Sequence, residues 1–143
     1  MTRYLGEGWM VPGTDALTKR FFSAGALVFQ QCAKCAHVQH PPTDVCGACQ
    51  SFEFTERASA GRGRIESRMV AHYAPHPALK DRLPYVVVLV SIDDVPGVRV
   101  IGNVVNRAPG EVAVGQRVRV CFEEAKDPES GEVLRIPQWE VVA

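Results

Sequence analysis

The sequence has no excess of charge of either sign and no long apolar segment. Its 143 residues carry 16 lysines and arginines against 16 aspartates and glutamates, so the formal net charge is zero. A chain without a positive surplus lacks the attraction on which general nucleic-acid binding depends. The longest strongly apolar run, Tyr85 to Val90, is far shorter than the roughly 20 residues that a membrane-spanning helix needs. We therefore expect no nucleic-acid partner and no membrane association.

An apolar signal core is missing from the first residues, Met1 to Gly8, so we expect a cytoplasmic protein. The chain has five cysteines, an odd number, and four of them are grouped in two pairs. In a chain without an export signal, paired cysteines are typical of metal binding and not of disulfide bonds.

The two cysteine pairs predict one metal site. Cys32 and Cys35 form a Cys-x-x-Cys pair, and Cys46 and Cys49 form a second pair after ten intervening residues. Two thiolates three residues apart in a tight turn face one centre, and two such turns supply a tetrahedral set of four sulfurs, which suits zinc. Four protein ligands leave no open position, so one structural zinc ion is expected. Iron uses the same ligands, and the spacing leaves a redox protein as an alternative.

The other candidate side chains receive structural interpretations. His37 and His40 lie between the pairs and are expected to face solvent, because four sulfurs already complete the site. Cys121 stands between apolar neighbours in an alternating segment and is expected to be a small buried residue. No serine lies in a nucleophile elbow, and no His-Glu-x-x-His helix is present. We predict no catalytic residue, and no enzymatic activity of the chain alone.

The pattern of apolar residues predicts a mainly β protein in three parts. Residues 1–25 are expected to form an arm and a short helix, which Thr14 or Asp15 would cap and Gly25 would end. Residues 26–57 are predicted to form a strand, a Cys-x-x-Cys turn (a knuckle), a loop, a second knuckle and a second strand, which together make a zinc ribbon. Residues 58–143 contain five β-rich segments without a helical interruption, and this count fits a five-stranded OB-type barrel.

Two further surfaces are candidates for binding. The expected helix and first ribbon strand carry more apolar side chains than so short a segment can bury, which predicts a partner interface. Its candidate residues are Leu17, Phe21, Phe22, Leu27 and Phe29. The basic, glycine-flanked residues Arg62 and Arg64 are candidates for contact with a phosphate, although a strand entry explains them equally well.

The order of these parts resembles a known family. Paired Phe21-Phe22 precede the stretch from Gly25 to Cys32, the remaining knuckle cysteines follow, and three further segments complete the set. These segments are Gly61-Arg62-Gly63-Arg64-Ile65, Pro84-Tyr85-Val86-Val87 and Val114 to Val120. The set covers about residues 14–142 and resembles the acyl-CoA-associated family that joins a rubredoxin-like zinc ribbon to an OB fold. The chain departs from the family pattern at Ala36, where glycine often follows the knuckle cysteine.

The resemblance implies a function. Members of this family are commonly accessory subunits or fused domains beside thiolase-like enzymes, including thiolases, aldolases and acyltransferases, and some help to hold coenzyme A. The resemblance therefore implies a non-catalytic subunit of a hetero-oligomer that acts on acyl-CoA. A hot-dog-fold enoyl-CoA hydratase as the large partner is one alternative. A single-stranded nucleic-acid module is another, because OB folds and zinc ribbons both serve there.

Overall fold

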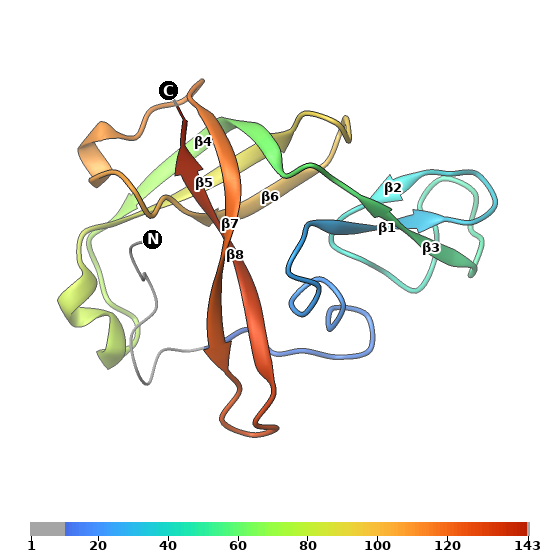
Figure 1. Ribbon diagram of the computed structural model, residues 1–143, viewed down its shortest axis with the longest axis horizontal. Coiled ribbons are helices and arrows are strands. Elements are labelled where there is room, and N and C mark those ends of the chain that lie inside the picture. Colours follow the sequence, from blue (N-terminus) through green and yellow to red (C-terminus); the bar gives the residue numbers. More distant parts are fainter. Residues whose placement is uncertain (1–10, 143) are drawn as a thin grey trace.

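The computed structural model describes residues 11–142, which form two antiparallel sheets joined by a short linker (Figure 1). The smaller sheet is the ribbon, with strand order β2-β1-β3, and the larger sheet has the order β6-β5-β4-β7-β8. The strands and 3-10 helices, in chain order, are β1 (Val28–Cys32), β2 (Val38–Gln39), β3 (Phe54–Ala58), β4 (Arg62–Ala71), η1 (Pro77–Arg82), β5 (Tyr85–Ile92), β6 (Arg99–Asn103), η2 (Pro109–Glu111), β7 (Arg117–Lys126) and β8 (Val133–Val141). No helix within residues 11–142 has the length and apolar composition needed to cross a bilayer.

The larger sheet is built on strand β5. Its residues alternate between buried and half-buried positions, and Val86, Val88, Val90 and Ile92 all point into the core. A β-branched side chain packs well on a pleated surface, and the alternation turns every second one inward. β5 therefore carries the core face of this sheet, with β4 and β6 paired on either side of it.

The larger sheet does not close into a barrel. Its edge strands β6 and β8 form no ladder with each other; the contacts between them include one isolated parallel bridge, from Val104 just after β6 to Trp139, and a bond from the N–H of Asn103 to Oε1 of Gln138 at 2.7 Å. Pro137 lies in the middle of β8 and has no N–H to donate, while the N–H of Arg135 is already bonded to the carbonyl of Phe22 at 2.7 Å. The expected number of five strands is confirmed, but a closed barrel is wrong, because β8 uses its free edge for other partners.

The expected N-terminal helix is also wrong, since residues 16–23 form a series of turns. Asp15 does cap them, because its Oδ1 accepts the N–H groups of Leu17 and Thr18 at 2.9 Å each. Gly25 ends the segment with φ of +69°. A helix this short recovers too few hydrogen bonds to offset the cost of its first turn, so capping alone does not propagate it. Residues 1–10 of the expected arm lie outside the described residues.

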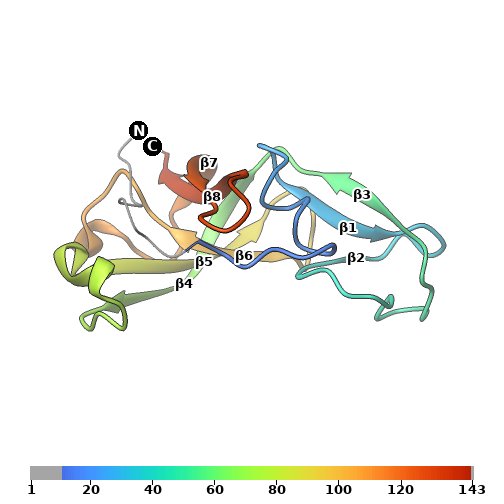
Figure 2. The same cartoon turned by 90° about the horizontal axis from the view of Figure 1, so that it is seen from below.

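The turn segment, residues 14–25, lies between the two sheets (Figure 2). Phe21, Leu27 and Phe29 are 9 %, 1 % and 2 % exposed and belong to the same core as the valines of the larger sheet. The ribbon and the larger sheet therefore share one hydrophobic core, and the turn segment and β1 contribute to it.

His40 also joins this core, and the expectation that it faces solvent is wrong. Its ring is half-buried, with its centroid 4.6 Å from that of Phe21 and 5.4 Å from that of Phe29. The loop between the knuckles folds back over the turn segment, which a reading of the loop alone does not reveal. Burial lowers the pKa of His40, because removal from water disfavours the charged imidazolium.

The linker between the sheets is held by Asp94, in the turn after β5. Its carboxylate accepts the hydroxyl of Ser59 at 2.6 Å and the N–H of Ala60 at 2.8 Å, and its carbonyl accepts Nη2 of Arg57 at 2.9 Å. The Ser59 hydroxyl and then the Ala60 N–H hold the pKa of Asp94 below its usual value. These bonds fix the direction in which the chain leaves β3 and enters β4.

The close approach of β6 to Trp139 requires glycine at position 102. A Cβ on Gly102 would lie 2.9 Å from Cδ1 of Trp139, a rigid side chain with no exposed surface. We predict that Gly102→Ala lowers the free energy of unfolding by about 1–3 kcal/mol through overpacking. Urea unfolding measures this loss, and Gly110→Ala is the control, because nothing lies within 4 Å of its Cβ position. Equal stability of the two variants would contradict the packing described here.

The buried His40 predicts a stability that depends on pH. Because folding lowers the pKa of His40, the neutral imidazole favours the folded state. The protein therefore has its full stability above the unfolded-state pKa, near 6.5, and loses stability as the pH falls through the folded-state pKa. We predict that His40→Gln reduces the loss of stability below about pH 6.5. Thermal unfolding of the variant and of the unchanged chain between pH 5 and 8 tests this, and equal losses in the two proteins would contradict it.

Candidate metal centre and its surroundings

The four predicted cysteines come together at the far end of the ribbon. Their Sγ atoms all lie within 4.8 Å of one another, and Cys32 to Cys49 and Cys35 to Cys46 are each separated by 3.6 Å. A tetrahedron of sulfurs around zinc, with bonds of about 2.3 Å, has edges of about 3.8 Å. The sulfur positions therefore fit a four-coordinate zinc ion, and four ligands leave no open position for substrate or water.

The two knuckles repeat the same hydrogen bonds fourteen residues apart. In each knuckle the residue after the second cysteine donates to the carbonyl of the first, from Ala36 to Cys32 at 3.0 Å and from Gln50 to Cys46 at 2.9 Å. Both of these residues have positive φ, +64° for Ala36 and +61° for Gln50. The tight turns that aim two sulfurs at one centre thus require a left-handed residue at each repeat.

Backbone amides stabilise negative charge on the buried sulfur of each pair. The N–H groups of Lys34 and Cys35 point to Sγ of Cys32, and that of Ala48 points to Sγ of Cys46, each at 3.4 Å. The pKa of Cys32 is lowered mainly by the Cys35 N–H, and the pKa of Cys46 is lowered mainly by the Cys49 N–H. A thiolate is the form that binds metal, so these amides favour the ligating state of Cys32 and Cys46.

Each knuckle has one buried and one exposed sulfur ligand. Cys32 and Cys46 are 2 % and 0 % exposed, whereas Cys35 and Cys49 are exposed at the tip of the ribbon. Phe52 stands beside the exposed pair and is itself largely exposed. The metal centre therefore lies just under the surface and not in the shared core.

Two glutamines, Gln30 and Gln39, hold the loop between the knuckles. Nε2 of Gln39 donates to Oε1 of Gln30 at 2.8 Å, and Nε2 of Gln30 donates to the carbonyl of Thr43 at 2.8 Å. Oε1 of Gln39 accepts the N–H of Gly47 in the second knuckle at 3.0 Å. Glutamine in a short strand carries no distinctive signal, so only the fold reveals this network.

The five candidate interface residues separate into two groups. Phe21, Leu27 and Phe29 are buried within the chain and have almost no surface to offer a partner. They are buried in the shared core, which also contains Val88 and Trp139 of the larger sheet. Leu17 and Phe22 are half-buried, and contact of these two with a partner remains a prediction.

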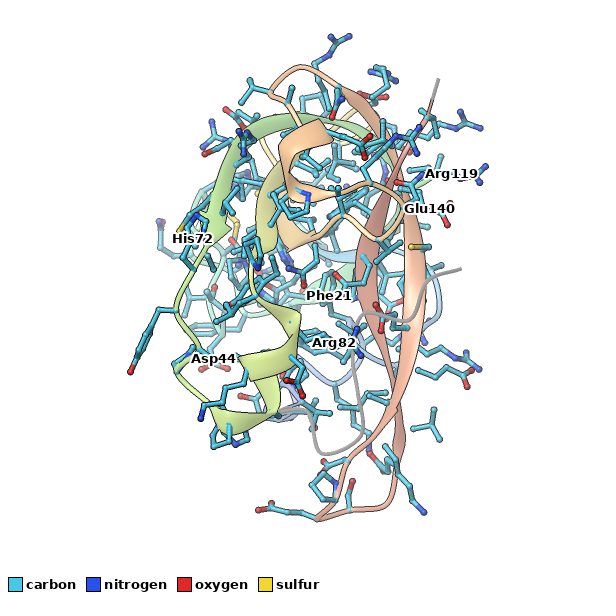
Figure 3. The ribbon with its side chains drawn as sticks, turned by 90° about the vertical axis from the view of Figure 1, so that its left-hand side faces the viewer. Phe21, Asp44, His72, Arg82, Arg119 and Glu140 are labelled. Atoms are coloured by element: carbon cyan, nitrogen blue, oxygen red, sulfur yellow. The ribbon has the colours of Figure 1, made fainter. Side chains whose placement is uncertain are left out.

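Arg62 and Arg64 lie on the outer face of β4, where both side chains are exposed. Nη1 of Arg64 donates to the carbonyl of Gly115 at 3.1 Å. Their cross-strand partners on β7 are Arg119 and Arg117, which no motif in the sequence indicates. Figure 3 shows Arg119 beside Glu140, whose Oε2 accepts Nε of the arginine at 2.9 Å. The neighbouring arginines become visible only once the pairing of β4 with β7 is known.

A groove of about 670 Å³ lies where the turn segment and the ribbon loop meet the larger sheet. Its lining includes Val87 and Ile101 of β5 and β6, Phe22 of the turn segment, and Pro41 and Pro42 of the ribbon loop. Most of the lining is apolar, so the groove suits an apolar group and not a free anion.

Cys121 is half-buried in β7. Burial, and then the nearby carboxylates of Glu140 and Glu123, raise the pKa of its thiol to about 12. A protonated thiol is a weak nucleophile, which agrees with the packing role expected for this residue.

The structure thus defines a four-cysteine zinc ribbon followed by an OB-type sheet. The ChsH2 rubredoxin-like zinc ribbon domain matches residues 23–55, and the ChsH2 C-terminal OB-fold domain matches residues 56–123. The chain belongs to this family of acyl-CoA-associated zinc ribbon and OB-fold proteins, and it is also similar to DUF35 domain-containing scaffold proteins.

Three similar proteins illustrate the family. A probable enoyl-CoA hydratase alpha subunit of Thermomonospora curvata is 42 % identical over 72 % of this chain, which spans only 31 % of that protein's length. A DUF35 domain-containing scaffold protein of Methanothermobacter thermautotrophicus is 31 % identical over 71 % of this chain and 74 % of its own length. A chain of the solved Ltp2-ChsH2(DUF35) aldolase is 35 % identical, with a TM-score of 0.78, and covers 93 % of this chain and 100 % of its own length.

Loss of one ligand should release the metal. We predict that Cys32→Ala binds no zinc where the unchanged chain binds one ion, and that the ribbon unfolds, because the metal supplies much of its folding free energy. Zinc content by atomic emission, together with the dispersion of amide resonances, measures both effects. Cys121→Ala is the control and should keep the ion. A Cys32→Ala protein that retains zinc would contradict this ligand set.

The left-handed residue of the first knuckle predicts a stabilising substitution. Alanine at positive φ is strained by about 1–2 kcal/mol, and glycine relieves this at an entropic cost of about 0.5–1 kcal/mol. We predict that Ala36→Gly raises the free energy of unfolding by up to about 1 kcal/mol, whereas Ala33→Gly, three residues earlier, lowers it. Chemical unfolding of the zinc-loaded proteins measures both, and a loss with Ala36→Gly would contradict the argument.

Proposed function

We propose that this chain is a non-catalytic accessory subunit that binds a thiolase-like acyl-CoA enzyme and completes it. The observation that carries the proposal is the likeness to the Ltp2-ChsH2(DUF35) aldolase, in which a chain of this fold and nearly this length is named together with Ltp2. The closed four-sulfur site supports the same interpretation, since a metal without an open position stabilises structure and does not activate substrate.

Contact of Arg62 and Arg64 with coenzyme A is one of two alternative uses of these residues, the other being contact with a protein surface. Both guanidinium groups are exposed on β4, and arginine binds phosphate through paired hydrogen bonds. Titration of coenzyme A into the assembled complex, with and without Arg62→Gln, tests this contact. Zinc is proposed as the ion in the ribbon, and a colourless protein that contains one zinc would exclude iron.

A hydratase partner is the second candidate function. The relative from Thermomonospora curvata is named as an enoyl-CoA hydratase alpha subunit, and it shares 42 % identity over the region matched. A chain that spans 31 % of such a protein would correspond to one part of it, with the hydratase chemistry supplied by a separate polypeptide.

Co-expression distinguishes the two candidates. We predict that the chain co-purifies at constant stoichiometry with a thiolase-like subunit, for which the Ltp2 subunit of the solved relative is the probe, and that the pair is more active on acyl-CoA than the large subunit alone. Binding to a hot-dog-fold hydratase subunit in place of Ltp2 would favour the second candidate. Turnover of an acyl-CoA by the purified chain alone would contradict the accessory role.

A further inference from the structure

One outer face of the larger sheet combines an apolar half with an arginine-rich half. Cross-strand partners point to the same side of a sheet, so Met69 opposite Val87 and Leu89 opposite Ile101 form one continuous surface. Met69 and Ile101 are 58 % and 65 % exposed, although the residues on the opposite face of β5 are buried. Exposed apolar patches of this kind mark interaction surfaces.

The arginine-rich half continues the same face toward β7. Arg62 lies directly opposite Arg119, and Arg64 lies directly opposite Arg117. Like charges directly opposite each other destabilise a sheet, so this arrangement disfavours the fold of the isolated chain. The fifth arginine, Arg99, stands at the start of β6, opposite Ser91 of β5.

Acidic side chains balance only part of this charge. Arg99 pairs with Glu66, Arg117 with Asp93, and Arg119 with Glu140. Within residues 11–142, Arg62 and Arg64 have no carboxylate partner. The face therefore keeps two positive charges beside its apolar half, although the whole chain is neutral.

The shape and composition of this face favour a protein surface as its occupant. Small ligands bind in concave sites, whereas these arginines stand on the outer side of neighbouring strands. Single-stranded nucleic acid needs aromatic side chains among the cations for its bases to stack on, but Tyr85 lies at the far end of β5, opposite Ala71, whereas Arg64 lies opposite Ser91 near the other end. Methionine, arginine and apolar side chains together are typical of the core and rim of protein interfaces.

We propose that this face docks on a protein surface in which apolar side chains are flanked by carboxylates, and that this surface belongs to the large subunit. The identity of the large subunit rests on the proposed function. The apolar half would supply the buried centre of the interface, and Arg62 and Arg64 would steer association and fix its orientation.

Binding to the Ltp2 probe, measured by biolayer interferometry, tests the proposal. We expect Ile101→Asp, and separately Arg62→Glu with Arg64→Glu, to weaken the complex at least about tenfold, with the charge effect fading in high salt. Val133→Asp and Lys126→Glu are matched controls on the hairpin between β7 and β8, where both side chains are exposed, and should bind like the unchanged chain. Zinc content and melting temperature verify that every variant is folded.

The outcomes separate this inference from the proposed function. If the unchanged chain binds Ltp2 and the face variants bind equally well, the docking face is wrong and the accessory role stands. If the unchanged chain binds neither Ltp2 nor the hydratase subunit, the proposed function fails.

A second measurement tests the role of Arg62 and Arg64 without any partner subunit. Poly-L-glutamate should bind the unchanged chain in a salt-sensitive manner, and the double arginine variant should lose this binding. Absence of binding by the unchanged chain would overturn the inference. Coenzyme A or a single-stranded thymidine oligonucleotide could instead bind the unchanged chain more tightly than poly-L-glutamate does. If the double arginine variant also loses that binding, the inference is overturned.

Discussion

The ribbon depends on four sulfur atoms that two short turns bring to one point. Fourteen residues separate the equivalent atoms of the two turns, and each turn uses its own amides to stabilise one thiolate. Outside these turns the ribbon has only three short strands, of which β2 has two residues. A sheet this small is not stable by itself, so the bound ion and the core shared with the larger sheet together maintain it.

The shared core makes the two parts of the chain interdependent. Phe29 extends from the ribbon and Phe21 from the turn segment into a core that also contains Val88 and Trp139 of the larger sheet. Asp94 holds the linker from the side of the larger sheet by accepting from Ser59 and Ala60. A partner that binds the chain therefore meets a ribbon and an OB-type sheet in a fixed mutual orientation. A rigid two-part surface loses less entropy on binding than two parts joined by a mobile linker, which suits a scaffold.

The predictable features were those with a local chemical signal. The spacing of Cys32, Cys35, Cys46 and Cys49 indicated the metal centre, and β-rich segments such as Tyr85–Ile92 indicated the five strands. The N-terminal helix was wrong because a cap and a stop do not ensure propagation over so few residues. His40 and the outward arginines of β7 were missed because their surroundings come from segments distant in sequence. Local signals therefore identified the elements and the ligands, and long-range pairing determined what the elements contact.

The unequal exposure of the four sulfurs bears on how the ion is exchanged. Cys35 and Cys49 meet solvent, whereas Cys32 and Cys46 are covered by protein. An incoming chelator or competing ion can reach only the outer two, so ligand substitution begins there and the inner two are the last to dissociate. A macromolecule seated over the tip, beside Phe52, would shield that route and slow metal turnover without any change in the affinity of the site itself.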